Sequence, residues 1–292
     1  MTSYKIGHFL IRIIATQPLW WLYAKSSFFA FILTLFPTAT RIARRNFYRV
    51  FPESTVFSRW GMTFKYFEAF IDFLYEKAKM TCFSEKDIKE HCQFEHIEIL
   101  EQLVKEHTFV LCFGGHMVNF EYLVSLPLHL QNIGMCHIFL SAPPNDWTKQ
   151  MMAERGQYGA VNIPSNNVLR HVIQLKQNIE EKKDSKIGYV LGSLSDFDPK
   201  ISPYHISPFL GHTLEVKTGA ERIGRKLNMG YCYAYISRPK RGYYVVDFRP
   251  LELSEKVISS TPFPYTDEFV HQLDINIREH PELWMQWGYC RF

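Results

Sequence analysis

The sequence predicts an α/β fold with a mostly parallel central sheet flanked by helices, together with an N-terminal membrane-associated helical segment. Three observations predict it. The stretch "TFVLCF" at 108–113 is a continuous apolar run, which is typical of a strand covered on both faces. A helical pattern and a second apolar run follow, and this strand–helix–strand order implies a parallel pair with a right-handed crossover. A long apolar segment with one formal charge precedes all of these, at 13–36.

The N-terminal residues 1–40 have the features of a membrane-anchoring segment, and residues 41–292 those of one α/β domain. A membrane span needs about 20 apolar residues, and the run at 13–36 is long enough. Gln17, Pro18 and Lys25 interrupt it, so one span and two short interfacial helices both stay open. Four arginines follow within "RIARRNFYR", and such a cluster favours the cytoplasmic side and anionic lipid.

The other elements are expected from their hydrophobic periodicity and their turn residues. We expect helices over 54–80, 97–105, 118–130, 147–156, 168–183 and 263–279. We expect strands over 108–113, 135–142 and 186–192, and two further strands within 229–253 joined by a turn at 239–242. The stretch "EHCQFEH" at 90–96 is expected to be the solvated start of a helix.

Charge and cysteine content exclude several classes of function. The net charge of +4 is small, and no stripe of lysine and arginine interleaves with aromatic residues, so we expect no nucleic-acid partner. The six cysteines form no C-x-x-C pair and are expected to be reduced, mostly buried thiols. Cys92 and its two neighbouring histidines lack a second ligand cluster, so we expect neither a metal nor a cofactor.

The stretch "CFGGHMVNFEYL" at 112–123 places a histidine and a glutamate where a strand gives way to a helix. Residues five apart point in different directions within one regular helix. His116 and Glu121 can therefore meet only if His116 lies in the turn and Glu121 in the first helical turns. Gly114 and Gly115 would allow the sharp turn and the close approach of a substrate.

A histidine and a carboxylate in this arrangement suit acyl transfer. A neutral histidine can accept a proton from an attacking hydroxyl, while a carboxylate on its other nitrogen fixes the tautomer. The first N–H groups of the helix would stabilise the oxyanion. The stretch "GSLSD" lacks the second glycine of a nucleophile elbow, and no phosphate-binding loop or dinucleotide fingerprint is present.

Several stretches resemble the lipid A biosynthesis lauroyl/myristoyl acyltransferases, a branch of the glycerolipid acyltransferase superfamily. "GGHMVNFE" resembles the H-x4-(D/E) block of that family, with His116, Asn119 and Glu121 in matching places. "RIARRNFYRVFPE" resembles its basic segment, and Arg155 in "MMAERGQYG" matches an arginine that the family carries. Asp196 matches the aspartate of a later block, and "HPELWMQW" resembles the C-terminal signature.

The resemblance implies transfer of a fatty acyl chain from an acyl carrier protein thioester to a hydroxyl of a lipid A-type acceptor, at the cytoplasmic face of the inner membrane. It implies His116 and Glu121 as a catalytic pair, and Gly115, Asn119, Arg155 and Asp196 as substrate-binding residues. Residues 41–292 would then be the catalytic domain. Three alternatives stay open: another acceptor such as a polyene-type lipid, a thioesterase or lipid hydrolase that activates water, and a non-catalytic membrane-binding protein. The resemblance predicts neither the length of the acyl chain nor the oligomeric state.

Overall fold

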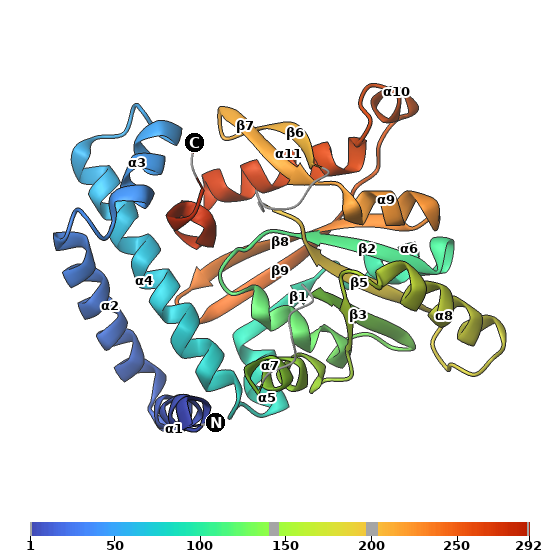
Figure 1. Ribbon diagram of the computed structural model, residues 1–292, viewed down its shortest axis with the longest axis horizontal. Helices are drawn as coiled ribbons and strands as arrows, with labels where there is room; N and C mark the ends of the chain where they lie inside the picture. Colours follow the sequence, from blue (N-terminus) through green and yellow to red (C-terminus); the bar gives the residue numbers. More distant parts are fainter. Residues whose placement is uncertain (1, 140–145, 197–203, 291) are drawn as a thin grey trace.

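The computed structural model describes residues 2–139, 146–196, 204–290 and 292. Within these residues, a seven-stranded sheet has the order β1–β9–β8–β2–β5–β3–β4 (Figure 1). Every neighbouring pair is parallel except the β8–β9 hairpin. The strands are β1 (Cys92–Glu95), β2 (Phe109–Gly114), β3 (Ile133–Phe139), β4 (Val161–Pro164), β5 (Gly188–Leu194), β8 (Gly230–Lys240) and β9 (Tyr243–Pro250). The expected mostly parallel sheet is thus confirmed.

Helices surround the sheet, and a two-stranded antiparallel sheet of β6 (Tyr204–Phe209) and β7 (His212–Lys217) stands beside it. The α-helices are α1 (Thr2–Thr16), α2 (Leu19–Leu35), α3 (Arg41–Val50), α4 (Val56–Met80), α5 (Glu85–His91), α6 (Ile97–His107), α7 (Asp146–Gly156), α8 (Val168–Glu180), α9 (Gly219–Lys226), α10 (Glu255–Ile258) and α11 (Pro264–Glu279). Three 3₁₀ segments complete the described chain: η1 (Phe120–Leu128), η2 (Pro281–Leu283) and η3 (Met285–Gly288).

Most of the predicted elements are confirmed to within a few residues, and two expectations were wrong. The helix expected over 118–130 is the 3₁₀ segment η1, because Asn119 caps its start and Pro127 cannot donate an N–H within it. The stretch at 90–96 is the end of α5 followed by β1, not a helix start. Residues 140–142 of the strand expected over 135–142 lie outside the described residues.

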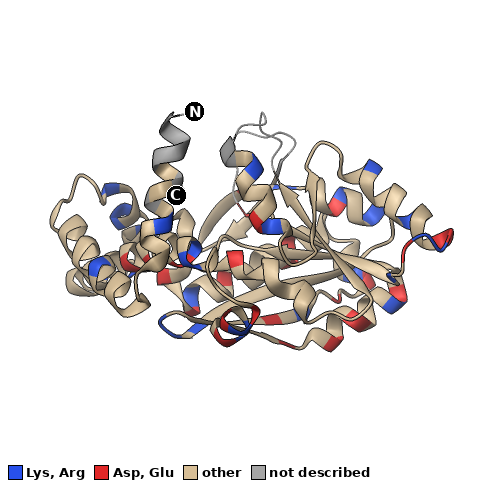
Figure 2. Cartoon of the chain, turned by 90° about the horizontal axis from the view of Figure 1, so that it is seen from below, with Lys and Arg blue, Asp and Glu red and all other residues tan. Residues whose placement is uncertain are grey.

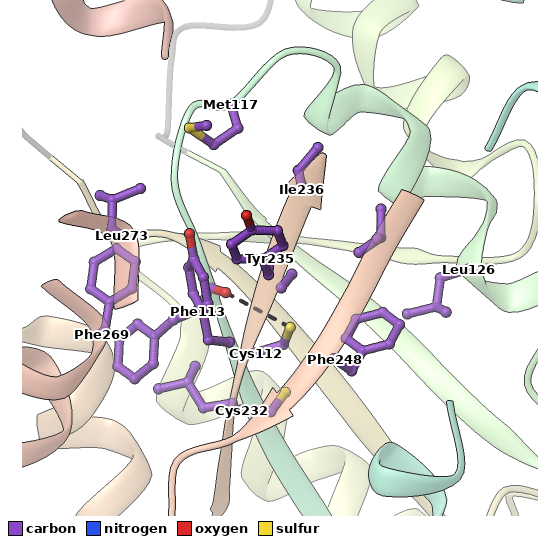
Figure 3. Close-up of a cluster of buried hydrophobic side chains, with 14 of the residues drawn as sticks. Cys112, Phe113, Met117, Leu126, Cys232, Tyr235, Ile236, Phe248, Phe269 and Leu273 are labelled. Carbon is purple, nitrogen blue, oxygen red and sulfur yellow. Dashed lines mark hydrogen bonds between the residues drawn. The ribbon is translucent and has the colours of Figure 1, made fainter. Parts of the chain in front are cut away.

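Strand β2 packs on both faces because its side chains alternate between them. On one face, Phe113 stacks on Phe269 of α11 at 5.0 Å between ring centroids. Figure 3 shows Phe269 and Leu273 on this side of the strands, and Leu126 of η1 with Phe248 of β9 on the other. Both faces are therefore buried, as the continuous apolar run predicts.

The N-terminal segment forms two helices that pack along α4 at one side of the sheet (Figure 1). The chain breaks between α1 and α2 at Gln17 and Pro18, as the interruption in the sequence indicates. Among the described helices, none combines the length and the apolarity that a bilayer crossing requires. Lys25 is the only charged residue of α2, whereas both signs of charge are spread over the rest of the fold (Figure 2).

Candidate active site

His116 lies in the turn that follows β2, at the carboxyl end of the central strand. Backbone hydrogen bonds join this turn to the C-terminal segment: Val118 N donates to the Leu283 carbonyl at 2.8 Å, and Met285 N donates to the His116 carbonyl at 2.9 Å. The site is thus fixed by residues far apart in the sequence.

Asp196 is the carboxylate that holds the His116 imidazole. It follows β5, which pairs with β2, so the two residues meet at the same edge of the sheet. The Asp196 Oδ1 atom lies 2.6 Å from His116 Nδ1, and Oδ2 accepts the backbone N–H of His116 at 2.9 Å. The indole of Trp284 donates to the same Oδ2 at 3.0 Å. These bonds satisfy a buried carboxylate.

The charges of this pair stabilise each other. Burial lowers the pKa of His116, but the charge and hydrogen bond of Asp196 outweigh it and leave that pKa above its ordinary value. Burial raises the pKa of Asp196, but His116 and the indole of Trp284 outweigh it and lower that pKa. The pair therefore favours an imidazolium next to a carboxylate, which is the state that proton uptake by His116 produces.

Glu121 lies elsewhere than we expected from the H-x4-E spacing. Its carboxylate forms ion pairs with Lys77 of α4 at 2.6 Å and with Arg155 of α7 at 3.2 Å. The 3₁₀ segment begins only at Phe120, and its first turn directs Glu121 toward these helices rather than toward the imidazole. Burial raises the pKa of Glu121, but Lys77 and Arg155 outweigh it and keep that pKa below its usual range.

Asn119 is buried, and its side chain connects α4 to the start of η1 by hydrogen bonds. Its Nδ2 donates to Glu76 Oε2 at 3.1 Å, and its Oδ1 accepts the N–H of Glu121 at 3.1 Å. The N–H groups of Phe120 and Tyr122 also bond to backbone carbonyls, at 2.8 and 3.2 Å. The donors that we expected to stabilise an oxyanion at this helix start are therefore already engaged.

Gly115 is required by close packing. A Cβ atom at this position would lie 2.5 Å from Leu273 Cδ1 of α11, so a larger residue would force the Leu273 side chain or the turn to shift. The structure thus supplies a packing reason for the second glycine of the motif, and Gly115 brings His116 directly onto the sheet edge.

A cavity of about 60 Å³ lies on the sheet face behind His116. Phe120, whose ring meets the His116 ring edge-on at 5.4 Å between centroids, lines it. The rest of its wall comes from β2, β3, β5, β8, β9, η1 and α7 and is mostly apolar, with Glu121, His137 and Arg155 among its polar residues. Its mostly apolar wall suits a section of an apolar chain attached to a group that reacts at His116.

Two residues of this site carry no signal in the sequence. Lys77 belongs to a helix whose sequence pattern indicates only hydrophobic packing. Trp284 lies in the C-terminal signature and had no predicted role. Asp196 was expected to bind substrate and lies instead against His116. In the described stretches, no group of three or more His, Cys, Asp or Glu side chains is placed to hold a metal ion.

A comparison with known protein families matches residues 1–288 to the family described as "Bacterial lipid A biosynthesis acyltransferase". The match covers both the N-terminal helices and the sheet that carries His116. No curated protein matches the chain.

Proposed function

The chain belongs to the bacterial lipid A biosynthesis acyltransferase family and is an O-acyltransferase, and we propose that it moves a fatty acyl chain from an acyl carrier protein thioester to a hydroxyl of a lipid A-type glycolipid. The acceptor and the donor are the parts of this statement that go beyond the family. The observation that carries the proposal is the pair formed by half-buried His116 and fully buried Asp196, 2.6 Å apart beside an apolar cavity.

In this proposal His116 is the general base, and Asp196 takes the orienting role that the spacing suggested for Glu121. When Nδ1–H donates to Asp196, Nε2 is the basic atom of the ring. It accepts the proton of the acceptor hydroxyl as that oxygen attacks the thioester carbonyl. The tetrahedral intermediate then collapses: the carbon–sulfur bond breaks, and the imidazolium returns its proton to the departing thiolate. Asp196 stabilises the imidazolium between the two steps.

The acyl chain would lie in the cavity behind Phe120. A chain whose carbonyl stands at His116 passes this ring to reach the apolar walls that η1 and β5 provide. Burial of its methylenes in such a space is favourable by about 0.8 kcal/mol each.

Arg155 and Asn119 complete the proposed binding region. The Arg155 guanidinium has five donors, and one bond to Glu121 leaves others for an anionic group of the acceptor. If so, Arg155→Lys should raise the KM for the acceptor, and an unchanged KM would exclude this role. Asn119 acts through Glu121 and Glu76, which makes it a positioning residue.

The N-terminal helices would hold the enzyme against the cytoplasmic face of the inner membrane. The residues of α2 that pack inward are mostly small: Leu22, Ser26, Ala30 and Thr34. Its large apolar residues face outward instead, as do several of α1 and α3: Phe9, Ile13, Trp20, Trp21, Phe28, Phe29, Phe31, Leu35, Ile42 and Tyr48. An apolar patch of this kind is typical of a surface that meets lipid.

The proposal is tested with the purified full chain, acyl carrier protein thioesters and a lipid A precursor, by mass spectrometry of the lipid. The wild type should add the mass of one acyl chain. His116→Ala should lose about 10²- to 10⁴-fold in transfer at an unchanged melting temperature. Acyl release to water in excess over transfer would point to a thioesterase instead. Transfer to another lipid from the same cells, with the precursor untouched, would reassign the acceptor.

A further inference from the structure

The cavity behind Phe120 contains a polar group that no atom of the described residues satisfies. In β3, residues Met135 and His137 are two apart and both line the cavity, as the strand period requires. The Nε2 atom of His137 is buried and has no hydrogen-bond partner in the described part of the chain. The two charged groups of the wall, Glu121 and Arg155, are paired with each other.

This imidazole is neutral, which defines what can bind it. Burial, and then the charge of Arg155, lower the pKa of His137 to about 4, and Glu121 opposes them only in part. A neutral imidazole has one donor nitrogen and one acceptor nitrogen. A hydroxyl can both donate and accept, so it matches Nε2 in either tautomer, whereas a carbonyl or a cation matches only one.

The space beside His137 is kept open. At Gly192 of β5, a Cβ atom would lie 3.0 Å from Met135 Cε and 3.7 Å from His137 Nδ1, so a side chain there would crowd this wall. The cavity, at about 60 Å³, exceeds the roughly 10–15 Å³ that one water needs. A ligand group therefore fits next to the imidazole.

We infer that this cavity selects an acyl chain that carries a hydroxyl group, and that His137 Nε2 forms a hydrogen bond with that hydroxyl. The inference rests on the proposed acyl transfer. A saturated chain would displace water and leave the buried nitrogen unpaired, which costs free energy that a hydroxylated chain recovers.

The register of the sheet indicates where the hydroxyl lies along the chain. His137 pairs with Gly192, which precedes Asp196 by four residues on the same stretch of chain. The strand ends at Leu194, so two of these four steps lie within β5, and they alone span about 7 Å. The hydroxyl is therefore expected in the body of the chain, several carbons from the thioester.

The test is a competition between acyl carrier protein thioesters of equal chain length, one saturated and the others with a single hydroxyl at different carbons. For the wild type, kcat/KM should be about tenfold or more higher for at least one hydroxylated donor. His137→Leu should abolish this preference and favour the saturated chain. The matched control is His129→Leu, because the buried Nε2 of His129 also has no hydrogen-bond partner among the described residues, and His129 does not line the cavity. It should keep the wild-type preference.

Two results would overturn the inference and leave the proposed function standing: equal transfer of all donors by the wild type, or a preference that survives in His137→Leu. The comparison of donors with the wild type tests the inference even if His137→Leu does not fold. Absence of transfer from every donor would contradict the proposed function itself, and the inference with it.

Discussion

If His116 is the general base, as proposed, its pKa sets the pH range in which acyl transfer should lose activity. A general base works only when it is unprotonated, so kcat/KM should rise with pH through this pKa and then level off. Asp196 holds the pKa of His116 above its ordinary value of 6.5. The acid limb of the wild type should therefore lie above pH 6.5.

Asp196→Asn removes the carboxylate that raises this pKa, so its acid limb should move to lower pH and its plateau should fall. The measurement is kcat/KM for acyl transfer between pH 5 and pH 9, with a donor that is stable over this range. A limb at the same pH in both proteins would show that another group controls the profile.

At the scale of elements, α2 is arranged as a surface helix whose outer face is apolar. Trp20, Phe28 and Phe31 are all exposed, whereas the inner residues pack on α4. Replacing these three by serine should weaken flotation with anionic liposomes by about tenfold or more, because each large ring contributes about 1.5–3 kcal/mol when buried. Deleting residues 1–40 would be a poorer test, since it would uncover the face of α4 that α2 covers.

The control for this experiment is Ile173→Ser on α8, an exposed apolar residue on a different helix. It should leave flotation unchanged. Retained flotation of the triple variant would show that a surface other than α2 contacts the membrane.

Glu76 joins four elements and should make the stability of the fold depend on pH. Its buried carboxylate accepts hydrogen bonds from Tyr23 of α2, Asn119 and Tyr244 of β9 at 2.8–3.1 Å. Burial, and then the charge of Asp72, raise the pKa of Glu76 from 4.5 to about 7. The folded state thus binds a proton more tightly than the unfolded chain does.

The Glu76 contribution to the free energy of unfolding should therefore be full below pH 4.5 and fall by roughly 3 kcal/mol as pH rises to 7. Denaturant unfolding of the wild type and Glu76→Gln between pH 4.5 and 8 isolates this contribution. The wild type should lose stability relative to Glu76→Gln as pH rises. A constant difference across the range would mean that Glu76 does not titrate there.

At the scale of the whole molecule, the site is assembled from segments that only the tertiary fold brings together. His116 follows β2, Asp196 follows β5, and Trp284 lies near the C-terminus. Asn46 of α3 in turn donates to the carbonyls of Trp287 and Cys290 at 2.8 and 2.7 Å, so the N-terminal part supports the same C-terminal segment. Helix α3 therefore supports the C-terminal segment whose Trp284 donates to Asp196.

Because the site is assembled from distant segments, only part of the fold and of the site could be predicted from the sequence. The strands and helices follow from local periodicity, and the position of His116 in a turn after β2 follows from the two glycines. The identity of Asp196 as the partner of His116 does not follow from local sequence. The two residues are 80 positions apart, and β5 lies next to β2 only in the folded sheet. Glu121 was the nearer carboxylate in sequence, yet the 3₁₀ geometry of η1 turned it toward Lys77 and Arg155. Local spacing cannot report either effect.

In the proposed mechanism His116 and Asp196 act as one unit, while Glu121 belongs to a separate ion-pair cluster. The most direct test measures kcat/KM for acyl transfer in His116→Ala, in Asp196→Asn, in Glu121→Gln and in the two double variants with His116→Ala, with melting temperatures alongside. Asp196→Asn should cost about 10²-fold or more alone, yet almost nothing further on His116→Ala, because an orienting group without its base has no role. The loss in Glu121→Gln should persist in full on His116→Ala. The opposite pattern would contradict these roles: Glu121→Gln adds nothing to the loss in His116→Ala, whereas the losses in Asp196→Asn and His116→Ala multiply.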